Sequence, residues 1–153
     1  ANQMRASAFP VTKPMTLDQI QAEVTTLVGA SNFRLGIWAD NGSCYPGALL
    51  MDTGNLSGAT VQVVNYAIPG NLVLSPGLYW FGILGDAAIT FRTINVVGGL
   101  LNYLGRPSAM GLNWRSPFYI VAQTFGALPN PFTAGGTVNN AANAIPEIIV
   151  HAI

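Results

Sequence analysis

Charged side chains are scarce in this chain of 153 residues: Lys, Arg, Asp and Glu together make up 8% of the sequence, whereas hydrophobic residues make up 50%. Soluble domains carry about 25% charged residues. A surface with so little charge is typical of a chain partly covered by other subunits, so we expect a homo-oligomer or a component of a larger particle. The six basic residues form no cluster, so the positive stripe that binds nucleic acid is not expected.

Cysteine and long apolar runs are equally limited. The one cysteine, Cys44, excludes an intramolecular disulfide and a zinc site built from several thiolates, and we interpret it as a residue of a polar loop. Gly, Pro, Asn or Thr interrupts every apolar run before it reaches the roughly 18 to 20 residues of a membrane-spanning helix. We therefore expect no membrane insertion.

The residues that could carry catalysis are few. His151, the one histidine, lies beside Ile149 and Ile153 at the end of the chain, and we interpret these three residues as a contact between subunits. Asp40 and Asp86 lie in turn signatures, where carboxylates cap backbone amides. The sequence thus predicts no enzyme, no metal site and no cofactor; a calcium site at the Asp-Asn-Gly-Ser turn of residues 40–43 is the alternative.

Apolar and polar residues alternate along most of the chain, with Gly, Pro, Asn or Asp between the alternating segments. Segment 17–27 could also form a helix, but the β-branched residues at 24–26 favour a strand. We predict a single all-β domain over residues 1–153, an antiparallel β-sandwich of jelly-roll type with about eight or nine strands and long loops at 98–117 and 125–144. The expected strands are 4–11, 17–27, 33–40, 48–51, 60–68, 78–84, 88–97, 117–123 and 145–153.

Two expectations are specific enough to test residue by residue. In segment 33–40 the alternation places Phe33, Leu35 and Ile37 toward the core and Trp38 outward. Segments 78–84 and 88–97 are both strongly apolar and flank Gly85-Asp86, which predicts a hairpin.

Aromatic and arginine side chains gather in the second half of the chain and beside the turn at 40–43. Aromatic rings that stack on sugars, with Arg and Asn as hydrogen-bond donors, are one way for such loops to bind glycans. Trp, Tyr and Arg are also enriched where subunits meet, so a subunit contact is the competing interpretation. The candidate ligand-binding residues are Tyr103, Arg106, Trp114, Arg115, Tyr119 and Trp38.

Three segments carry a resemblance to a known family: RLGIWADNG at 34–42, YPGALLMDTG at 45–54 and LSPGLYWFG at 74–82. This pattern resembles the C-terminal β-sandwich domain of bacteriophage fibre and collagen-like virion proteins, and MTLDQIQAEVTT at 15–26 is similar to the strand that precedes it there. The resemblance covers residues 5–92 and departs from the family at Trp38, where Tyr is usual. It implies a virion structural protein that assembles as a trimer.

Three functions are compatible with these observations. A head-fibre or tail-fibre tip domain would expose the 98–119 segment and contact a carbohydrate on the host surface. A capsid decoration protein would instead bind other virion proteins and no host ligand. A carbohydrate-binding module of a secreted enzyme would require a linker to a catalytic domain. We expect a virion location and rank the fibre tip first, decoration second.

Overall fold

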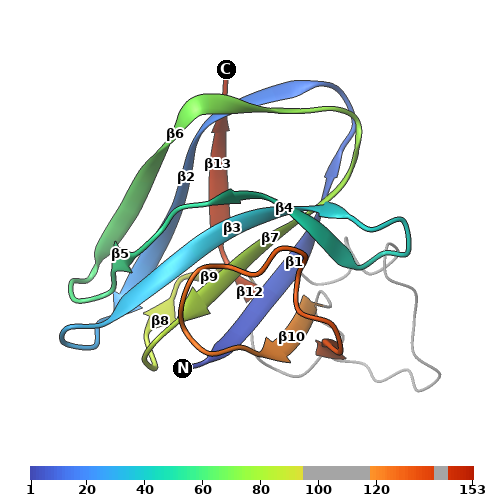
Figure 1. Ribbon diagram of the computed structural model, residues 1–153. Coiled ribbons are helices and arrows are strands. Elements are labelled where there is room, and N and C mark those ends of the chain that lie inside the picture. The colour runs from blue at the N-terminus through green and yellow to red at the C-terminus, as the bar shows by residue number, and fades with distance from the viewer. Residues whose placement is uncertain (95–117, 140–144) are drawn as a thin grey trace.

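The computed structural model describes residues 1–94, 118–139 and 145–153 (Figure 1). This part of the chain contains strands and no helix, and it forms two antiparallel sheets that pack face to face. The predicted all-β sandwich is confirmed, while the jelly-roll connectivity stays a prediction. No helix long and apolar enough to cross a membrane occurs among these residues.

The larger sheet, which we call sheet A, contains seven strands. Their order is β11-β10-β1-β7-β3-β4, and β5 also pairs with β3. Three long strands lie at the centre of this sheet. β3 carries most of the first family-like segment, β7 carries most of the third, and β1 pairs with β7. The bounds are β1 Gln3–Val11, β3 Asn32–Asp40, β4 Pro46–Asp52, β5 Leu56–Ser57, β7 Gly77–Gly85, β10 Phe118–Ala122 and β11 Thr137–Asn139.

The smaller sheet, sheet B, has the order β13-β2-β6, and β8 also pairs with β2. A separate two-stranded ladder joins β9 and β12. Thirteen strands are thus present in the described residues where about eight or nine were expected, because several are only two or three residues long. The bounds are β2 Met15–Thr26, β6 Gln62–Leu74, β8 Thr90–Phe91, β9 Thr93–Ile94, β12 Ile145–Pro146 and β13 Ile148–Ala152.

The main core lies between the two sheets. Along β2 the buried residues Ile20, Ala22 and Val24 alternate with residues that remain partly exposed, so the strand interpretation of this segment is confirmed and the helix is excluded. Phe33, Leu35 and Ile37 enter the same core from sheet A. The core comprises Val11, Leu17, Ile20, Ala22, Val24, Phe33, Leu35, Ile37, Met51, Ile68, Leu74, Phe81 and Ile83.

The predicted hairpin about Gly85-Asp86 is wrong. β7 already pairs with β1 on one edge and β3 on the other, so no edge is free for a strand that follows it. The chain instead crosses to sheet B, where Phe91 of β8 pairs with Val24 of β2. The Asp86 carboxylate accepts hydrogen bonds from the Asn32 backbone amide at 2.8 Å and side-chain amide at 3.1 Å, which holds the crossing in place.

The expected loop at 125–144 is partly confirmed. Residues 124–136, here called the strap, run across the outer face of sheet A between β10 and β11, visible as the orange segment in front of the sheet in Figure 1. The short strand β11 interrupts the expected loop and pairs with β10. The expected loop at 98–117 lies outside the described residues.

Candidate functional site

Trp38 is fully buried, so the expectation that it is an exposed, ligand-accessible ring is wrong. Its side chain does leave the opposite face of β3 from Phe33 and Ile37, but the strap covers that face. The indole Nε1 donates a hydrogen bond to the Pro129 carbonyl at 3.1 Å, and the ring packs edge to face on Phe132 at a centroid distance of 5.3 Å. A ring enclosed in this way cannot stack on a sugar.

Two paired glycines create the space that Trp38 occupies. Gly36 of β3 and Gly82 of β7 face each other in the ladder. A Cβ on Gly36 would lie 2.6 Å from Trp38 Cη2, and one on Gly82 would lie 2.6 Å from Trp38 Cζ3. Carbon atoms pack at about 3.5 to 4.0 Å, so any side chain at these positions would displace the indole. Gly36 of the first family-like segment and Gly82 of the third therefore leave the space that the Trp38 ring occupies.

Tyr45 attaches the strap to sheet A, and Tyr119 packs against Tyr45. Their rings meet edge to face at 4.6 Å. The Tyr45 hydroxyl donates to the Thr133 carbonyl at 2.6 Å and accepts from the Gly136 amide at 2.9 Å, and the Tyr119 hydroxyl donates to the Cys44 carbonyl at 3.1 Å. Burial raises the pKa of Tyr119, because the phenolate is less well solvated there. Tyr119 keeps part of its surface in solvent, and its role toward a ligand stays a prediction.

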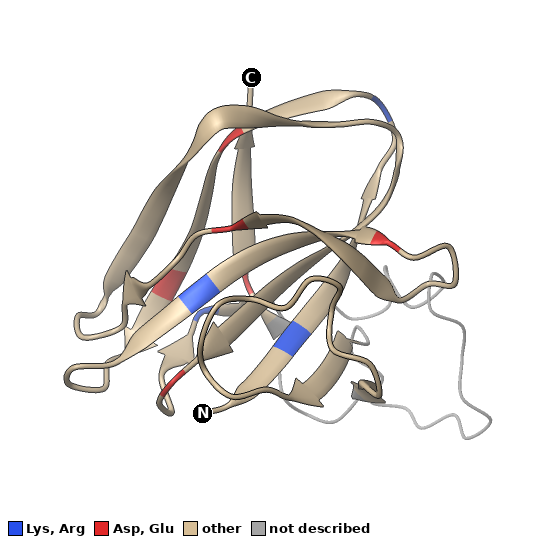
Figure 2. Cartoon of the chain, in the orientation of Figure 1, with Lys and Arg blue, Asp and Glu red and all other residues tan. Residues whose placement is uncertain are grey.

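The charged residues of the family-like segments are used within the fold. Arg34 Nη1 lies 2.6 Å from Asp52 Oδ2, and the same oxygen accepts the Leu128 amide of the strap at 3.0 Å. Asp40 Oδ1 accepts the Trp80 indole N–H at 2.9 Å. Figure 2 shows how sparse charges are along the rest of the described chain. These segments thus encode the sheet and the docking of the strap on it.

The turn at 40–43 uses its oxygens on its own backbone. Asp40 Oδ2 accepts the Gly42 amide at 2.7 Å and Asn41 Oδ1 accepts the Ser43 amide at 2.8 Å. The interpretation of Asp40 as a turn-capping residue is confirmed. In residues 1–94, 118–139 and 145–153, no group of three or more His, Cys, Asp or Glu side chains is placed to hold a metal ion.

The four remaining candidates for ligand binding are outside the part that the structure describes. Tyr103, Arg106, Trp114 and Arg115 fall between residues 95 and 117. A glycan site in that segment stays a prediction.

The residues expected at a subunit contact are on the surface of sheet B. Ile149 is 44% exposed and Ile153 is 68% exposed, and the exposed His151 approaches Asp18 with 2.6 Å between Nδ1 and Oδ1. The ladder aligns Ile149 with Gln21 and Asn65, and His151 with Gln19 and Ala67. Since Ile20 and Ala22 point into the core, this row points outward.

Sequence reasoning missed the valines that extend this surface. Val61, Val63 and Val73 are all at least half exposed, and Val63 pairs with Glu23 on the outward face of β2. Alternation in the predicted strand 60–68 contained this signal, because Val63 has the opposite parity to buried Ile68. We call the exposed set, Val61, Val63, Val73, Ile149, His151 and Ile153, the sheet B surface.

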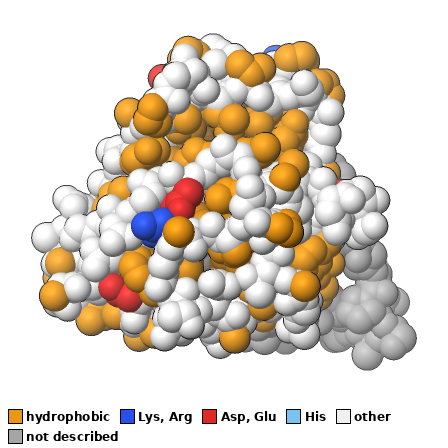
Figure 3. All heavy atoms as spheres, viewed as in Figure 1, with side chains coloured by type: hydrophobic (Ala, Val, Ile, Leu, Met, Phe, Trp, Pro, Cys, Tyr) orange, Lys and Arg blue, Asp and Glu red, His pale blue; other side chains and the backbone are white. Residues whose placement is uncertain are grey.

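Both edges of sheet B also lack a neighbouring strand within the described residues, since β13 and β6 end the order β13-β2-β6. Figure 3 shows hydrophobic side chains gathered in the upper half of the view, between β6 and β4, where the two sheets meet without hydrogen bonds. Leu56, Val64, Tyr66 and Leu72 are among the residues that pack only partly buried against the main core. An open edge of this kind can pair with another chain.

Comparison with known proteins gives no relative from which a function could be transferred. No protein-family model, curated protein or solved structure matches the chain.

Proposed function

We propose that this chain is a structural protein of a bacteriophage virion, assembled as a homotrimer at the tip of a head or tail fibre and exposed on the particle surface. Capsid decoration, in which the chain binds other virion proteins and no host ligand, is the second candidate. The observation that carries the proposal is the sheet B surface: branched apolar side chains, and strand edges that no other described strand pairs with, on a β-sandwich with few charged residues.

The chemistry of that surface favours association between copies. Its apolar residues alternate with uncharged Gln19, Gln21 and Asn65 along the ladder. Two acidic residues adjoin it, and each has a partner: Asp18 lies 2.6 Å from His151, and Glu23 is paired with Arg92 through a two-pronged contact with distances of 2.8 and 2.9 Å. Cores of protein interfaces are depleted in charge and enriched in apolar area, which is the composition found here.

The three family-like segments support the virion assignment in a different way. Arg34, Asp52, Asp40 and Trp80 hydrogen-bond to one another or to the strap, and Gly36 and Gly82 make room for Trp38. The segments thus specify a scaffold that many surfaces can be built on, as expected of a domain reused in fibres.

The assembly can be tested by sedimentation velocity on the purified chain at micromolar concentration. We expect a trimer, and we expect Ile149→Glu to dissociate it, because a carboxylate buried at an interface is costly. Val138→Glu is the matched control, since Val138 is also 44% exposed but lies on β11 of sheet A. A monomeric wild type, or equal effects of the two variants, would count against assembly through sheet B.

A glycan array separates the two candidates. Fibre-tip function predicts retention of at least one host-surface glycan and its loss in Trp114→Ala and Arg115→Ala. Decoration predicts no retained glycan together with direct binding to capsid proteins. Glycan binding that both variants preserve would place the recognition site elsewhere on the chain.

A further inference from the structure

Arg5 occupies an unusual position for a cation. Met4, Ala6 and Ala8 of β1 face the strap, whereas Phe9 and Val11 face the core between the sheets. Because side chains alternate along a strand, Arg5 shares the inward face with Phe9 and Val11. Arginine is among the residues most rarely placed inside unless it is paired.

No carboxylate of the chain pairs with Arg5. All six Asp and Glu residues lie in the described part, and none of them forms an ion pair with Arg5. Each has another neighbour: Asp18 contacts His151, Glu23 contacts Arg92, Asp52 contacts Arg34, Asp40 contacts Trp80, Asp86 contacts Asn32 and Glu147 lies near Arg92. Arg5 also donates no side-chain hydrogen bond to a described residue. Burial accordingly lowers its pKa, but a guanidinium stays charged in proteins.

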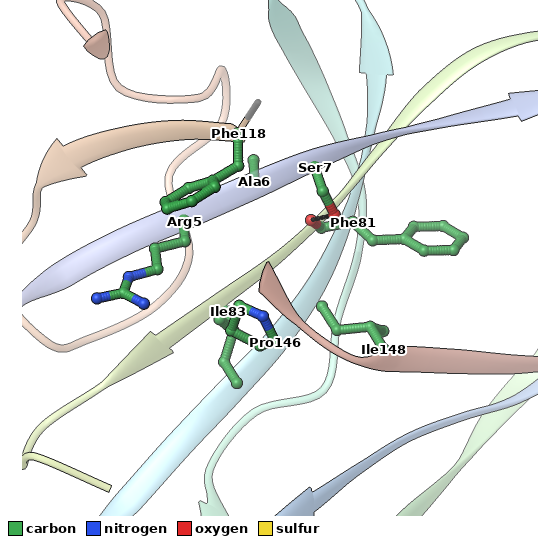
Figure 4. A pocket seen from close by; sticks show the side chains of 8 residues that line it. All are labelled: Arg5, Ala6, Ser7, Phe81, Ile83, Phe118, Pro146 and Ile148. Carbon is green, nitrogen blue, oxygen red and sulfur yellow. Dashed lines mark hydrogen bonds between the residues drawn. The ribbon is translucent and has the colours of Figure 1, made fainter. Parts of the chain in front are cut away.

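One face of the guanidinium is covered by an aromatic ring. Its central carbon lies 5.7 Å from the centroid of Phe118, in cation–π geometry. In Figure 4 the side chain runs beside Phe118 and its end points away from Ile148, and the narrow cleft toward Ile83 and Pro146 has no room for a water molecule. This packing orients the guanidinium, and none of its N–H groups donates a hydrogen bond to the part of the chain that the structure describes.

A second, wider cavity adjoins the same arginine. Its volume is about 240 Å³, and its lining includes Gln3, Arg5, Ile83, Ile89, Phe91 and Pro146. The lining thus combines apolar side chains with polar atoms in similar measure, and Arg5 and Gln3 supply its charged and amide side chains. Ligand sites in proteins typically combine an apolar wall with a few convergent polar groups.

We propose that this cavity binds the carboxylate of an acidic sugar, such as a uronic acid, with Arg5 as its ionic partner. The planar guanidinium matches a carboxylate through two parallel hydrogen bonds. Arg5 is the one cationic side chain of the lining, and one positive side chain matches a singly charged carboxylate better than a doubly charged phosphate. Gln3 can bond a hydroxyl, and the walls formed by Ile83, Phe91 and Pro146 accommodate the apolar face of a ring. A slender acidic side chain of a partner protein would leave much of the cavity empty. This inference does not depend on the virion assignment.

The test is titration of the whole chain with glucuronate, glucose and propionate, followed by NMR of the backbone amides. We expect glucuronate to shift the signals of Gln3, Arg5 and Ile89, and glucose, which has the ring but no carboxylate, to leave them unchanged. Propionate, which resembles an Asp side chain, should bind at least about tenfold more weakly than glucuronate. Equal binding of propionate would overturn the sugar assignment in favour of a protein carboxylate.

Variants connect the binding to Arg5. Arg5→Gln should weaken glucuronate binding about tenfold or more, and Arg5→Lys should also weaken it because the forked geometry is lost. Lys13→Gln removes the same charge from an exposed position and should leave the affinity unchanged. Thermal unfolding of each variant establishes that it folds. If glucuronate does not bind the wild type, or binds Arg5→Gln as tightly, the proposal is wrong.

Discussion

The substitution Gly82→Ala tests how Trp38 is packed under the strap. The added Cβ would lie 2.6 Å from Trp38 Cζ3 and 2.9 Å from the Arg5 carbonyl oxygen. The carbonyl belongs to the β1 ladder, and the indole is held by Pro129 and Phe132, so neither neighbour moves easily. Overpacking of this kind costs about 1 to 3 kcal/mol.

An opposing term reduces this cost. Replacing glycine by alanine restricts the unfolded chain and stabilises the fold by about 0.4 to 1 kcal/mol. We therefore expect Gly82→Ala to lower the free energy of unfolding by about 1 to 2 kcal/mol, because steric overlap exceeds the entropic gain. For a chain of this size, this corresponds to a fall in Tm of roughly 2 to 8 °C.

Urea and thermal unfolding followed by circular dichroism would measure this effect. Gly126→Ala is the control, because a Cβ on Gly126 would meet no atom within 4 Å. Its stability should change by no more than about 0.5 kcal/mol. In a Trp38→Leu background Gly82→Ala should cost about 1 kcal/mol less than in the wild type, since the clashing ring is gone. Equal costs in both backgrounds would refute the steric account.

Three further predictions concern charged and titrating groups. Asp52→Asn should lower the free energy of unfolding by about 1 to 3 kcal/mol in urea titrations, because Asp52 holds the strap through the Leu128 amide. The Tyr119 hydroxyl should ionise above the ordinary tyrosine pKa of 10.0. The stability that Tyr119 contributes should therefore be present below pH 10.0 and should disappear as the pH rises through the higher pKa of the folded protein. Phenolate absorbance, compared with that of Tyr119→Phe, would show this. The hydrogen bond from Arg92 lowers the pKa of Glu23 from its ordinary 4.5. The difference in stability between the wild type and Glu23→Gln should therefore be present above pH 4.5 and vanish as acid protonates the Glu23 carboxylate of the folded protein. A difference in Tm that stays unchanged at low pH would contradict this.

Alternation predicted the strands well because burial on one face leaves a direct record in the sequence. Ile20, Ala22 and Val24 point inward where the period-two pattern of β2 placed them, and Phe33, Leu35 and Ile37 do so in β3. The alternation shows on which face of the strand each side chain lies, because the pleat of a strand places successive side chains on opposite faces.

What covers the other face could not be predicted in the same way. Trp38 leaves the outward face of β3, but a strap about 90 residues further along the chain encloses it. The strap carries no alternation, and its docking depends on single contacts, such as the Asn130 side chain accepting the Leu49 amide at 3.1 Å. Contacts so distant in sequence leave no periodic signal.

The hairpin error has a similar origin. Apolar segments on both sides of Gly85-Asp86 favour local pairing, yet the partners of β7 are β1 and β3. Sequence proximity could not show that both edges of β7 were already occupied. Arg5 illustrates the converse: its inward parity beside Phe9 and Val11 was readable from the sequence, but its lack of a carboxylate partner required the three-dimensional arrangement.

The central claim, that the chain belongs to a virion, is tested most directly by looking for it in purified phage particles. Mass spectrometry of gradient-purified particles, with immunogold labelling of intact ones, would measure its presence and its position. We expect the chain in a copy number divisible by three and label on the particle exterior. Consistent absence from particles that are otherwise complete would contradict the assignment.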